Sequence, residues 1–206
     1  MTWLPYFFSI VAGYLLGCSS MALYLSKLKG VDMRASGSGN LGASNAMVLM
    51  GWGAGVLVGI HDIGKAVIAV LLAVWLWPEM PYIGAVAGVA CVLGHMFPFY
   101  LRFKGGKGFA SYLGMTIALN WKFALIVLVI VAVVTFITDY IVVGTLSTII
   151  IVPAYMSYSH HSFVLLAILC VATAVIFYKH RENYRRILDG TEIGLRKANR
   201  GDHRQV

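Results

Sequence analysis

Long apolar runs along the chain are separated by short polar stretches. The apolar runs cover residues 4–28, 46–77, 82–97, 109–120, 123–138, 140–158 and 162–179. Stretches of ~17–25 apolar residues cross a bilayer as helices, and several of these runs fall at the short end of that range. The pattern therefore predicts an all-α integral membrane protein with about seven short transmembrane helices and polar loops on its cytoplasmic face.

The basic residues orient these predicted helices. Eight of the 16 lysines and arginines lie between Lys179 and Arg204, and most of the others cluster in residues 27–34 and 102–107. Basic loops stay on the cytoplasmic side of a membrane. We therefore expect residues 1–206 to form one multi-pass membrane domain, with the N-terminus outside and a cytoplasmic basic tail from about residue 179. Seven crossings satisfy this orientation, and five would also do so.

Composition excludes a soluble globular protein. Of 206 residues, 60% are hydrophobic and 12% are charged, whereas soluble domains carry about 25% charged residues. The mean hydropathy is +0.82. The net charge of +8 indicates a membrane surface, not nucleic acid, because the basic residues flank apolar runs. The three cysteines lack the spacing of a metal site or a disulfide framework.

A first polar cluster, GSGNLGASN, covers residues 37–45. Its G-x-G-x-x-G spacing matches a dinucleotide fingerprint, but a membrane helix follows where a Rossmann unit is required. Glycines let backbone N–H groups approach an anion at a helix N-terminus. The side chains that add hydrogen-bond donors are Ser38, Asn40, Ser44 and Asn45. The cluster predicts a phosphate site, and the alternative is a flexible turn with a good N-cap.

A second cluster, GHMFPFYLRFKGGKGFAS, covers residues 94–111. It is not a Walker A loop, because its glycine spacing differs and Gly108 replaces the required hydroxyl residue. Two lysines bracket two glycines in residues 104–107, ahead of a helix, which favours an anion-binding nest. A topological loop would explain the lysines but not the glycines. Nor would it explain His95 at the end of an apolar run, where an ionisable residue indicates function.

The third cluster, HRENYRRILDGTE, covers residues 180–192. Helical spacing allows His180 and Asn183 to point the same way, and brings Glu182 within reach of Arg185 or Arg186. The alternative is a cytoplasmic amphipathic stub. Three such clusters on one membrane face are difficult to explain as topology signals alone.

Together the three clusters resemble the acyl-phosphate-dependent glycerol-3-phosphate acyltransferases of bacteria, the PlsY family. The resemblance extends from the first apolar run to Glu192, with Ser44 where the family usually has threonine. It implies an enzyme of the bacterial inner membrane with its site at the cytoplasmic face. Such an enzyme transfers an acyl chain from acyl phosphate to the 1-hydroxyl of glycerol 3-phosphate. The product is lysophosphatidic acid, and the reaction is the first step of phospholipid synthesis.

The resemblance also implies roles for individual residues. The residues expected at the substrate and phosphate site are Ser38, Gly39, Asn40, Asn45, His95, Lys104, Gly105, Gly106, Lys107, Gly108 and Thr145. His180 and Asn183 are expected to support the reacting groups, and Glu192 to be structural. We expect no catalytic nucleophile, no metal and no cofactor. The expected partners are acyl phosphate, glycerol 3-phosphate and the lipid bilayer, but no nucleic acid.

The residue chemistry agrees with this expectation. No histidine is followed by an aspartate five positions on, so the base of acyl-CoA-dependent glycerolipid acyltransferases is absent. An acyl phosphate has a good leaving group, so positioning and stabilisation of negative charge can supply most of the rate. The resemblance implies that a substrate phosphate assists proton removal.

Three positions depart from the family pattern. Val48 stands where the family usually has an arginine that grips the phosphate of glycerol 3-phosphate, and Arg102 is the candidate to replace that charge. Asp139 and Val142 stand where members often have a basic residue and serine. Loss of a charge-assisted contact costs about 1.5–3 kcal/mol.

These departures leave three hypotheses open. The first is acyl transfer from acyl phosphate to glycerol 3-phosphate. The second keeps the enzyme class but changes the acceptor to another small alcohol. The third is a non-catalytic membrane protein that binds or transports phosphorylated metabolites, because helix N-termini aimed at anions also serve transporters.

Overall fold

A computed structural model describes residues 3–192, 194 and 196, and every regular element among them is a helix. The chain divides into two compact units, Met1–Leu119 and Asn120–Val206. The prediction of an all-helical protein is confirmed. The expectation of a single domain over residues 1–206 stays a prediction.

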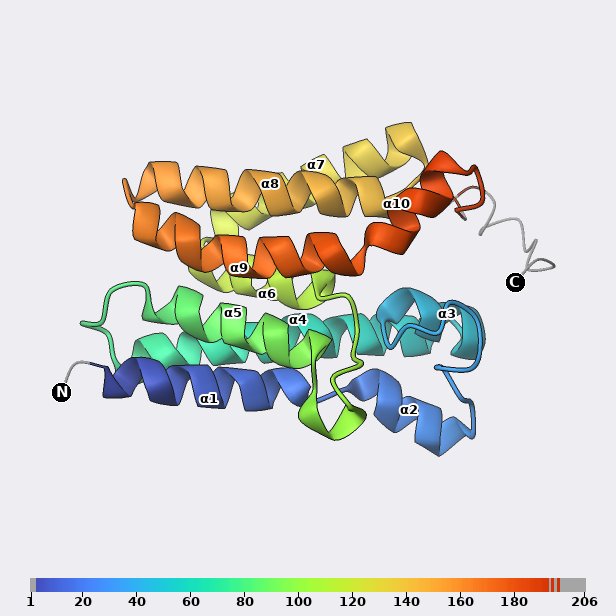
Figure 1. Ribbon diagram of the computed structural model, residues 1–206, viewed down its shortest axis with the longest axis horizontal. Helices are drawn as coiled ribbons and strands as arrows, with labels where there is room; N and C mark the ends of the chain where they lie inside the picture. Colours follow the sequence, from blue (N-terminus) through green and yellow to red (C-terminus); the bar gives the residue numbers. More distant parts are fainter. Residues whose placement is uncertain (1–2, 193, 195, 197–206) are drawn as a thin grey trace. The chain divides into compact units, whose positions relative to one another are not determined.

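The first unit contains six α-helices and one 3₁₀ helix among the described residues (Figure 1). They are α1 (Leu4–Cys18), α2 (Met21–Lys29), α3 (Ala43–Met50), α4 (Trp52–Leu76), α5 (Ile83–Met96), η1 (Phe99–Leu101) and α6 (Phe109–Leu119). The described part of the second unit contains α7 (Trp121–Thr138), α8 (Ile141–Ser159), α9 (Phe163–Lys179) and α10 (Arg181–Leu188).

Five helical segments among the described residues are long and apolar enough to cross a membrane. They are Leu4–Lys29, Trp52–Leu76, Ile83–Leu101, Trp121–Thr138 and Ile141–Ser159. Helix α9 reaches this length only together with α10, from which it is bent by 47°, and α6 is a shorter apolar helix of 11 residues. The five segments, α6 and α9 overlap the seven predicted apolar runs. That the chain crosses the membrane seven times stays a prediction.

Polar residues fix where several of these helices begin. The side chains of Ser20, Asn120 and Ser162 accept hydrogen bonds from backbone N–H groups three residues later, at 3.3, 3.0 and 3.2 Å. These caps satisfy N–H groups that the first turn of a helix leaves without partners. Such caps matter most in a membrane, where water cannot replace them.

Close packing of α1 on α5 forms the centre of the first unit. A Cβ on Gly13 or Gly17 would stand 2.4 or 2.0 Å from the carbonyl oxygens of Ala87 and Cys91. A Cβ on Gly94 would stand 2.1 Å from the carbonyl oxygen of Tyr14. Small residues let two helix backbones approach in this way, which is a common basis of helix association in membranes.

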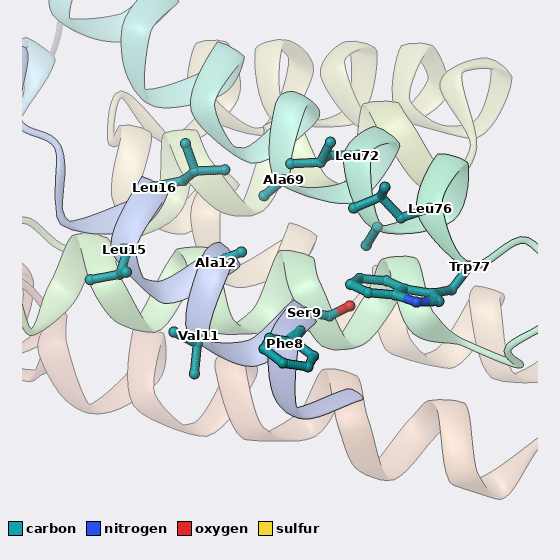
Figure 2. Close-up of a pocket in the computed structure, with 12 residues that line it drawn as sticks. Phe8, Ser9, Val11, Ala12, Leu15, Leu16, Ala69, Leu72, Leu76 and Trp77 are labelled. Atoms are coloured by element: carbon teal, nitrogen blue, oxygen red, sulfur yellow. The ribbon is translucent and has the colours of Figure 1, made fainter. Parts of the chain in front are cut away.

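An apolar groove lies between α1 and α4 (Figure 2). It has a volume of about 360 Å³, and Phe8, Leu16, Leu72 and Trp77 are among its lining residues. No residue of the three polar clusters lines it. The loops of the first two clusters lie instead beyond the end of α5, where α2 and α3 also lie (Figure 1).

The α1–α5 contact predicts a position-specific effect of small substitutions. Gly17→Ala should lower the thermal unfolding midpoint in detergent, because its methyl group meets backbone that cannot move aside. Overpacking of this kind costs about 1–3 kcal/mol. The matched control is Gly53→Ala on α4, where an added Cβ meets nothing within 4 Å. Equal midpoints for the two variants would contradict the close approach.

Candidate active site

The loop of the first cluster is organised by the side chain of Asn45. This residue is 3% exposed. Its Nδ2 donates to the carbonyl oxygens of Met33, Asn40 and Ser36 at 3.0, 3.1 and 3.3 Å. Its Oδ1 accepts the backbone N–H of Ser38 at 3.0 Å. One amide group therefore fixes the path of the backbone from residue 33 to residue 40.

Two glycines turn this loop around the amide of Asn45. Gly37 and Gly39 have φ values of +58° and +67°, which side chains other than glycine rarely adopt. A Cβ on Gly37 would also stand 2.3 Å from Oδ1 of Asn45. The turn leaves Ser38 and Gly39 exposed, so both candidate residues are accessible to a ligand.

The loop of the second cluster lies against the end of α5. The backbone N–H groups of Gly105 and Gly106 donate to the carbonyl oxygens of Met96 and His95 at 3.0 and 3.2 Å. A Cβ on Gly105 would stand 2.1 Å from the carbonyl oxygen of His95, and one on Gly106 would stand 2.1 Å from its ring Nε2. Glycine is required at both positions because His95 contacts the loop with its backbone and its ring.

The two loops meet in the first unit. Nη2 of Arg34, which precedes the first cluster, donates to the carbonyl oxygen of Lys104 at 2.9 Å. A Cβ on Gly106 would lie 3.0 Å from the carbonyl oxygen of Leu41. Asp32 fixes the start of the first loop by accepting the backbone N–H of Arg34 at 2.9 Å. The first two clusters therefore form one surface.

Helix α6 begins directly behind the second loop. Gly108 has a φ of +92°, and its carbonyl oxygen accepts the N–H of Tyr112 at 2.9 Å as the helix starts. Lys107, which precedes this turn, is partly buried. A glycine loop therefore precedes the N-terminus of α6, and helix N-termini attract anions. The anion-binding nest itself stays a prediction, because the N–H groups of Gly105 and Gly106 are bonded to the end of α5.

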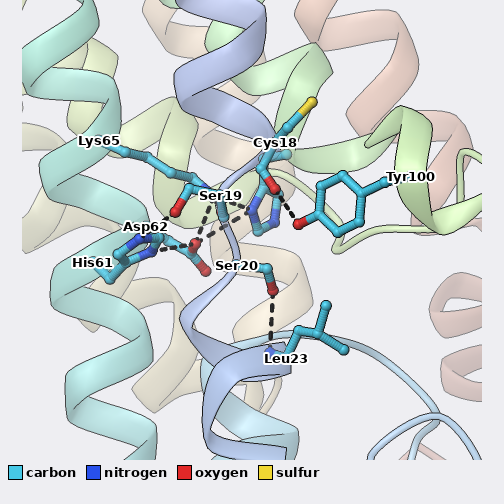
Figure 3. Close-up of polar contacts among 9 residues, drawn as sticks. Cys18, Ser19, Ser20, Leu23, His61, Asp62, Lys65 and Tyr100 are labelled. Carbon is cyan, nitrogen blue, oxygen red and sulfur yellow. Dashed lines mark hydrogen bonds and ion pairs between the residues drawn. The ribbon is translucent and has the colours of Figure 1, made fainter. Parts of the chain in front are cut away.

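A cluster of ionisable side chains lies behind these loops, inside the apolar helices (Figure 3). Asp62 and Lys65 of α4 form an ion pair at 2.8 Å. Nζ of Lys65 also lies 2.9 Å from Nδ1 of His95, and it donates to the carbonyl oxygen of Ser19 at 2.7 Å. Nε2 of His61 lies 3.0 Å from Oγ of Ser19.

The third cluster builds a separate arrangement in the second unit. Nδ1–H of His180 donates to the carbonyl oxygen of Ile176 at 2.9 Å. Nδ2 of Asn183 and Nε of Arg186 each donate to the carboxylate of Glu192 at 2.6 Å. The carboxylate of Glu192 therefore joins Asn183 to Arg186, and its structural role stays a prediction. Glu182 was expected to meet Arg185 or Arg186, but it pairs with Arg181 at 3.6 Å, and Arg186 pairs with Glu192.

Arg196, which follows the third cluster, contacts the end of α7 within the second unit. Oδ1 of Asp139, at the end of α7, accepts the backbone N–H of Arg196 at 2.9 Å. The guanidinium of Arg196 donates to the carbonyl oxygen of Phe136 at 3.0 Å. Asp139, which departs from the family pattern, therefore binds the tail of its own chain. Thr145 is buried on α8 and donates to the carbonyl oxygen of Ile141 at 3.2 Å.

Three charged residues of the first unit, Arg34, Asp62 and Lys65, were not predicted as parts of the site. Val48 is 55% exposed on α3, and Arg102, the candidate to replace its missing charge, is exposed with a φ of +53°. The cation that joins the two loops is instead Arg34. Asp62 and Lys65 were also unassigned, although ionisable residues three positions apart in an apolar run were a signal.

The arrangement in the first unit suits a phosphorylated ligand. The first loop exposes Ser38 and Gly39, α6 begins beside the second loop, and Arg34, Lys104 and Lys107 supply positive charge nearby. Such a surface stabilises anions through backbone donors and charge-assisted hydrogen bonds. The expectation that all three clusters form one site stays a prediction.

The contacts of Asn45 predict a sharp effect of a nearly isosteric change. Asn45→Asp replaces the amide donor by a carboxylate oxygen that faces the carbonyl oxygens of Met33, Ser36 and Asn40. We expect about 2–4 kcal/mol of destabilisation and faster proteolysis of residues 33–42. Ser44→Ala is the control, because Ser44 is an exposed neighbour. Equal protease resistance of the two variants would contradict the role of Asn45.

Comparisons with known proteins agree with this geometry. The family model for glycerol-3-phosphate acyltransferase matches residues 7–190. Glycerol-3-phosphate acyltransferase 1 of Oceanobacillus iheyensis is 35% identical over 92% of this chain and 95% of its own length. The corresponding enzyme of Mesorhizobium japonicum is 38% identical over 89% and 93%.

A solved structure is also similar. It is the crystal structure of PlsY (YgiH), an integral membrane glycerol 3-phosphate acyltransferase, in its glycerol 3-phosphate form. The TM-score is 0.86 at 34% sequence identity, and the match covers 92% of this chain and 95% of that chain. Its lysophosphatidic acid form gives a TM-score of 0.83, covering 92% and 94%. The chain is therefore a multi-pass integral membrane protein that belongs to the glycerol-3-phosphate acyltransferase family.

Proposed function

We propose that this chain transfers an acyl group from acyl phosphate to the 1-hydroxyl of glycerol 3-phosphate, giving lysophosphatidic acid and phosphate. The observation that carries the proposal is the meeting of two glycine-rich loops at the start of α6, joined by the hydrogen bond from Arg34 to Lys104. Family membership gives the reaction class, and this surface supplies a place for a phosphorylated substrate.

The first unit holds phosphate in this proposal. The exposed hydroxyl group of Ser38 acts as a donor in the first loop, and Lys107 supplies a charge at the start of α6. Gly105 and Gly106 keep the second loop close to α5, so that Lys104 and Lys107 stand on either side of the turn. Asn40 and Asn45 shape the first loop through their hydrogen bond, in which the Asn40 carbonyl accepts from Asn45.

The chemical step needs no enzyme nucleophile. The 1-hydroxyl oxygen attacks the acyl carbonyl carbon, a carbon–oxygen bond forms, and the bond from that carbon to the phosphate oxygen breaks. Phosphate leaves, and the hydroxyl proton passes to a phosphate oxygen of a substrate. Orientation of the two substrates and stabilisation of developing negative charge supply the rate.

Residues of the second unit have supporting roles in this proposal. The hydrogen bond to Ile176 fixes the orientation of the His180 ring, which in this proposal supports the reacting groups. Asn183 is oriented by Glu192, which is itself held by Arg186. Thr145 contributes a hydroxyl group on α8. These assignments follow the resemblance of the third motif.

The proposal also includes an orientation in the bacterial cell membrane. Basic residues concentrate in the polar loops and after Lys179, and basic segments favour the cytoplasmic side. We therefore place the phosphate-binding loops and the C-terminus in the cytoplasm and the N-terminus outside.

One position favours a second candidate function with a different acceptor. Val48 is exposed on α3 and offers no charge where the family usually has an arginine. Since a missing charge-assisted contact weakens phosphate binding by about 1.5–3 kcal/mol, another small alcohol is the alternative acceptor.

The direct experiment uses purified full-length protein, palmitoyl phosphate and labelled glycerol 3-phosphate. We expect labelled lysophosphatidic acid from the wild-type protein. Val48→Arg should lower the KM for glycerol 3-phosphate roughly 10-fold or more, because it adds a charge-assisted contact. Lys107→Ala should reduce turnover at least about 10-fold, whereas Lys122→Ala, in the exposed first turn of α7, is the matched lysine control.

The outcomes separate the two candidate functions. No product from either the wild-type protein or Val48→Arg would overturn the proposal. Transfer to another alcohol at a higher kcat/KM than to glycerol 3-phosphate would favour the second candidate. Undiminished turnover by Lys107→Ala would show that the second loop does not bind the substrate phosphate.

A further inference from the structure

Three ionisable side chains are buried in the first unit between helices that are long and apolar enough to cross a membrane. Asp62 and Lys65 of α4 are 3% and 5% exposed, and His95 at the end of α5 is 8% exposed. None of them is a nucleophile in the proposed reaction. Ionisable groups at such positions are costly, so they indicate a function that offsets the cost.

The ammonium group of Lys65 has as many acceptors as it has hydrogens. Nζ lies 2.8 Å from Oδ1 of Asp62, 2.7 Å from the carbonyl oxygen of Ser19 and 2.9 Å from Nδ1 of His95. An ammonium group donates three hydrogen bonds and accepts none. Nδ1 of His95 must therefore accept in this contact.

The contact with Lys65 fixes the proton of His95. Oδ1 of Asp62 also lies near Nδ1 of His95, but at 3.3 Å, which is longer than the 2.9 Å to Lys65. A protonated ring would place a second cation beside the ammonium group. The ring is therefore neutral with its hydrogen on Nε2, because a neutral imidazole that accepts at one nitrogen donates from the other.

The donating nitrogen of His95 faces the second loop. A Cβ on Gly106 would stand 2.1 Å from Nε2, and the N–H of Gly106 donates to the carbonyl oxygen of the same histidine at 3.2 Å. The ring edge is thus directed at the loop that carries Lys104 and Lys107.

We infer that Lys65, held by Asp62, sets the tautomer of His95 so that Nε2–H is a donor for the phosphate of glycerol 3-phosphate at the second loop. This inference rests on the proposed function and deepens it. Lys65 and Asp62 are positioning residues, and His95 is the residue that contacts the substrate.

A purely structural role predicts a different result. Lys65 also holds the end of α1 through the carbonyl oxygen of Ser19, and His61 contacts the hydroxyl of the same serine (Figure 3). If the cluster only joined helices, its loss would lower stability without a specific effect on the acceptor. The test therefore separates the KM for each substrate from kcat and from thermal stability.

The kinetic test uses the full-length enzyme and removes both charges together, so that no unpaired charge is left buried. We expect Asp62→Asn combined with Lys65→Met to raise the KM for glycerol 3-phosphate roughly 10-fold or more, with the KM for palmitoyl phosphate unchanged. Ser9→Ala is the control, because Ser9 is a buried polar residue of α1 outside this cluster. An unchanged KM for glycerol 3-phosphate in the double variant would overturn the inference.

A second comparison tests whether Lys65 acts through His95. In His95→Gln, the amide carries its own donor near the position of Nε2 and does not need Lys65 to set a tautomer. The combined Asp62→Asn and Lys65→Met change should therefore raise the KM for glycerol 3-phosphate in the wild-type background but not further in His95→Gln. Equal effects in both backgrounds would show that the ion pair and His95 act independently.

A spectroscopic measurement keeps the inference testable without activity. The measurement is the NMR spectrum of protein with ¹⁵N-labelled histidine rings. The ring-nitrogen signals that are present in the wild-type spectrum and absent from that of His95→Gln belong to His95. We expect an unprotonated Nδ1 and a protonated Nε2 in the wild-type protein, and loss of this preference in Lys65→Met. A protonated Nδ1 in the wild-type protein would overturn the inference. Absence of lysophosphatidic acid would instead count against the proposed function.

Discussion

The contact between His95 and the second glycine loop determines how the polar part of the first unit is built. The last turn of a helix leaves carbonyl groups without partners, and in a membrane protein such groups need partners from the chain itself. Here the carbonyl oxygens of His95 and Met96 accept the N–H groups of Gly106 and Gly105. The end of α5 is thereby satisfied, and the loop is fixed beside it.

The first loop follows from this contact. Gly106 packs near the carbonyl oxygen of Leu41, and Arg34 donates to the carbonyl oxygen of Lys104. Asn45 then holds the rest of the first loop with a single amide group. Positions that the sequence shows as two separate glycine-rich motifs therefore form one surface at the beginning of α6, where the helix dipole favours an anion.

Much of this organisation was predictable from local patterns. The apolar runs predicted the helices because a membrane requires long apolar segments, and the glycines of residues 37–42 and 105–108 predicted loops that approach an anion closely. The positive φ values of Gly37, Gly39 and Gly108 agree with the conformational freedom that glycine provides. The resemblance to a family of acyltransferases was confirmed by the family model, which matches residues 7–190.

Other features depend on contacts outside a single helix or strand, which the periodic pattern of a sequence does not reveal. Asn45 was expected to bind phosphate, yet its amide is engaged by the loop backbone. Arg186 pairs with Glu192 across a turn and not with Glu182 on its own helix. Asp139 stands where the family often has a basic residue, and its partner Arg196 lies 57 residues away. Only the tertiary structure identifies these partners.

The central claim is that the first two polar clusters bind one phosphate group together. Hydrogen–deuterium exchange of the full-length protein in detergent, with and without glycerol 3-phosphate, tests it most directly. The account predicts that the ligand slows exchange in residues 36–42 and in residues 103–109 at the same ligand concentration. Slower exchange in only one of these segments, or in neither at a concentration that supports acyl transfer, would contradict it.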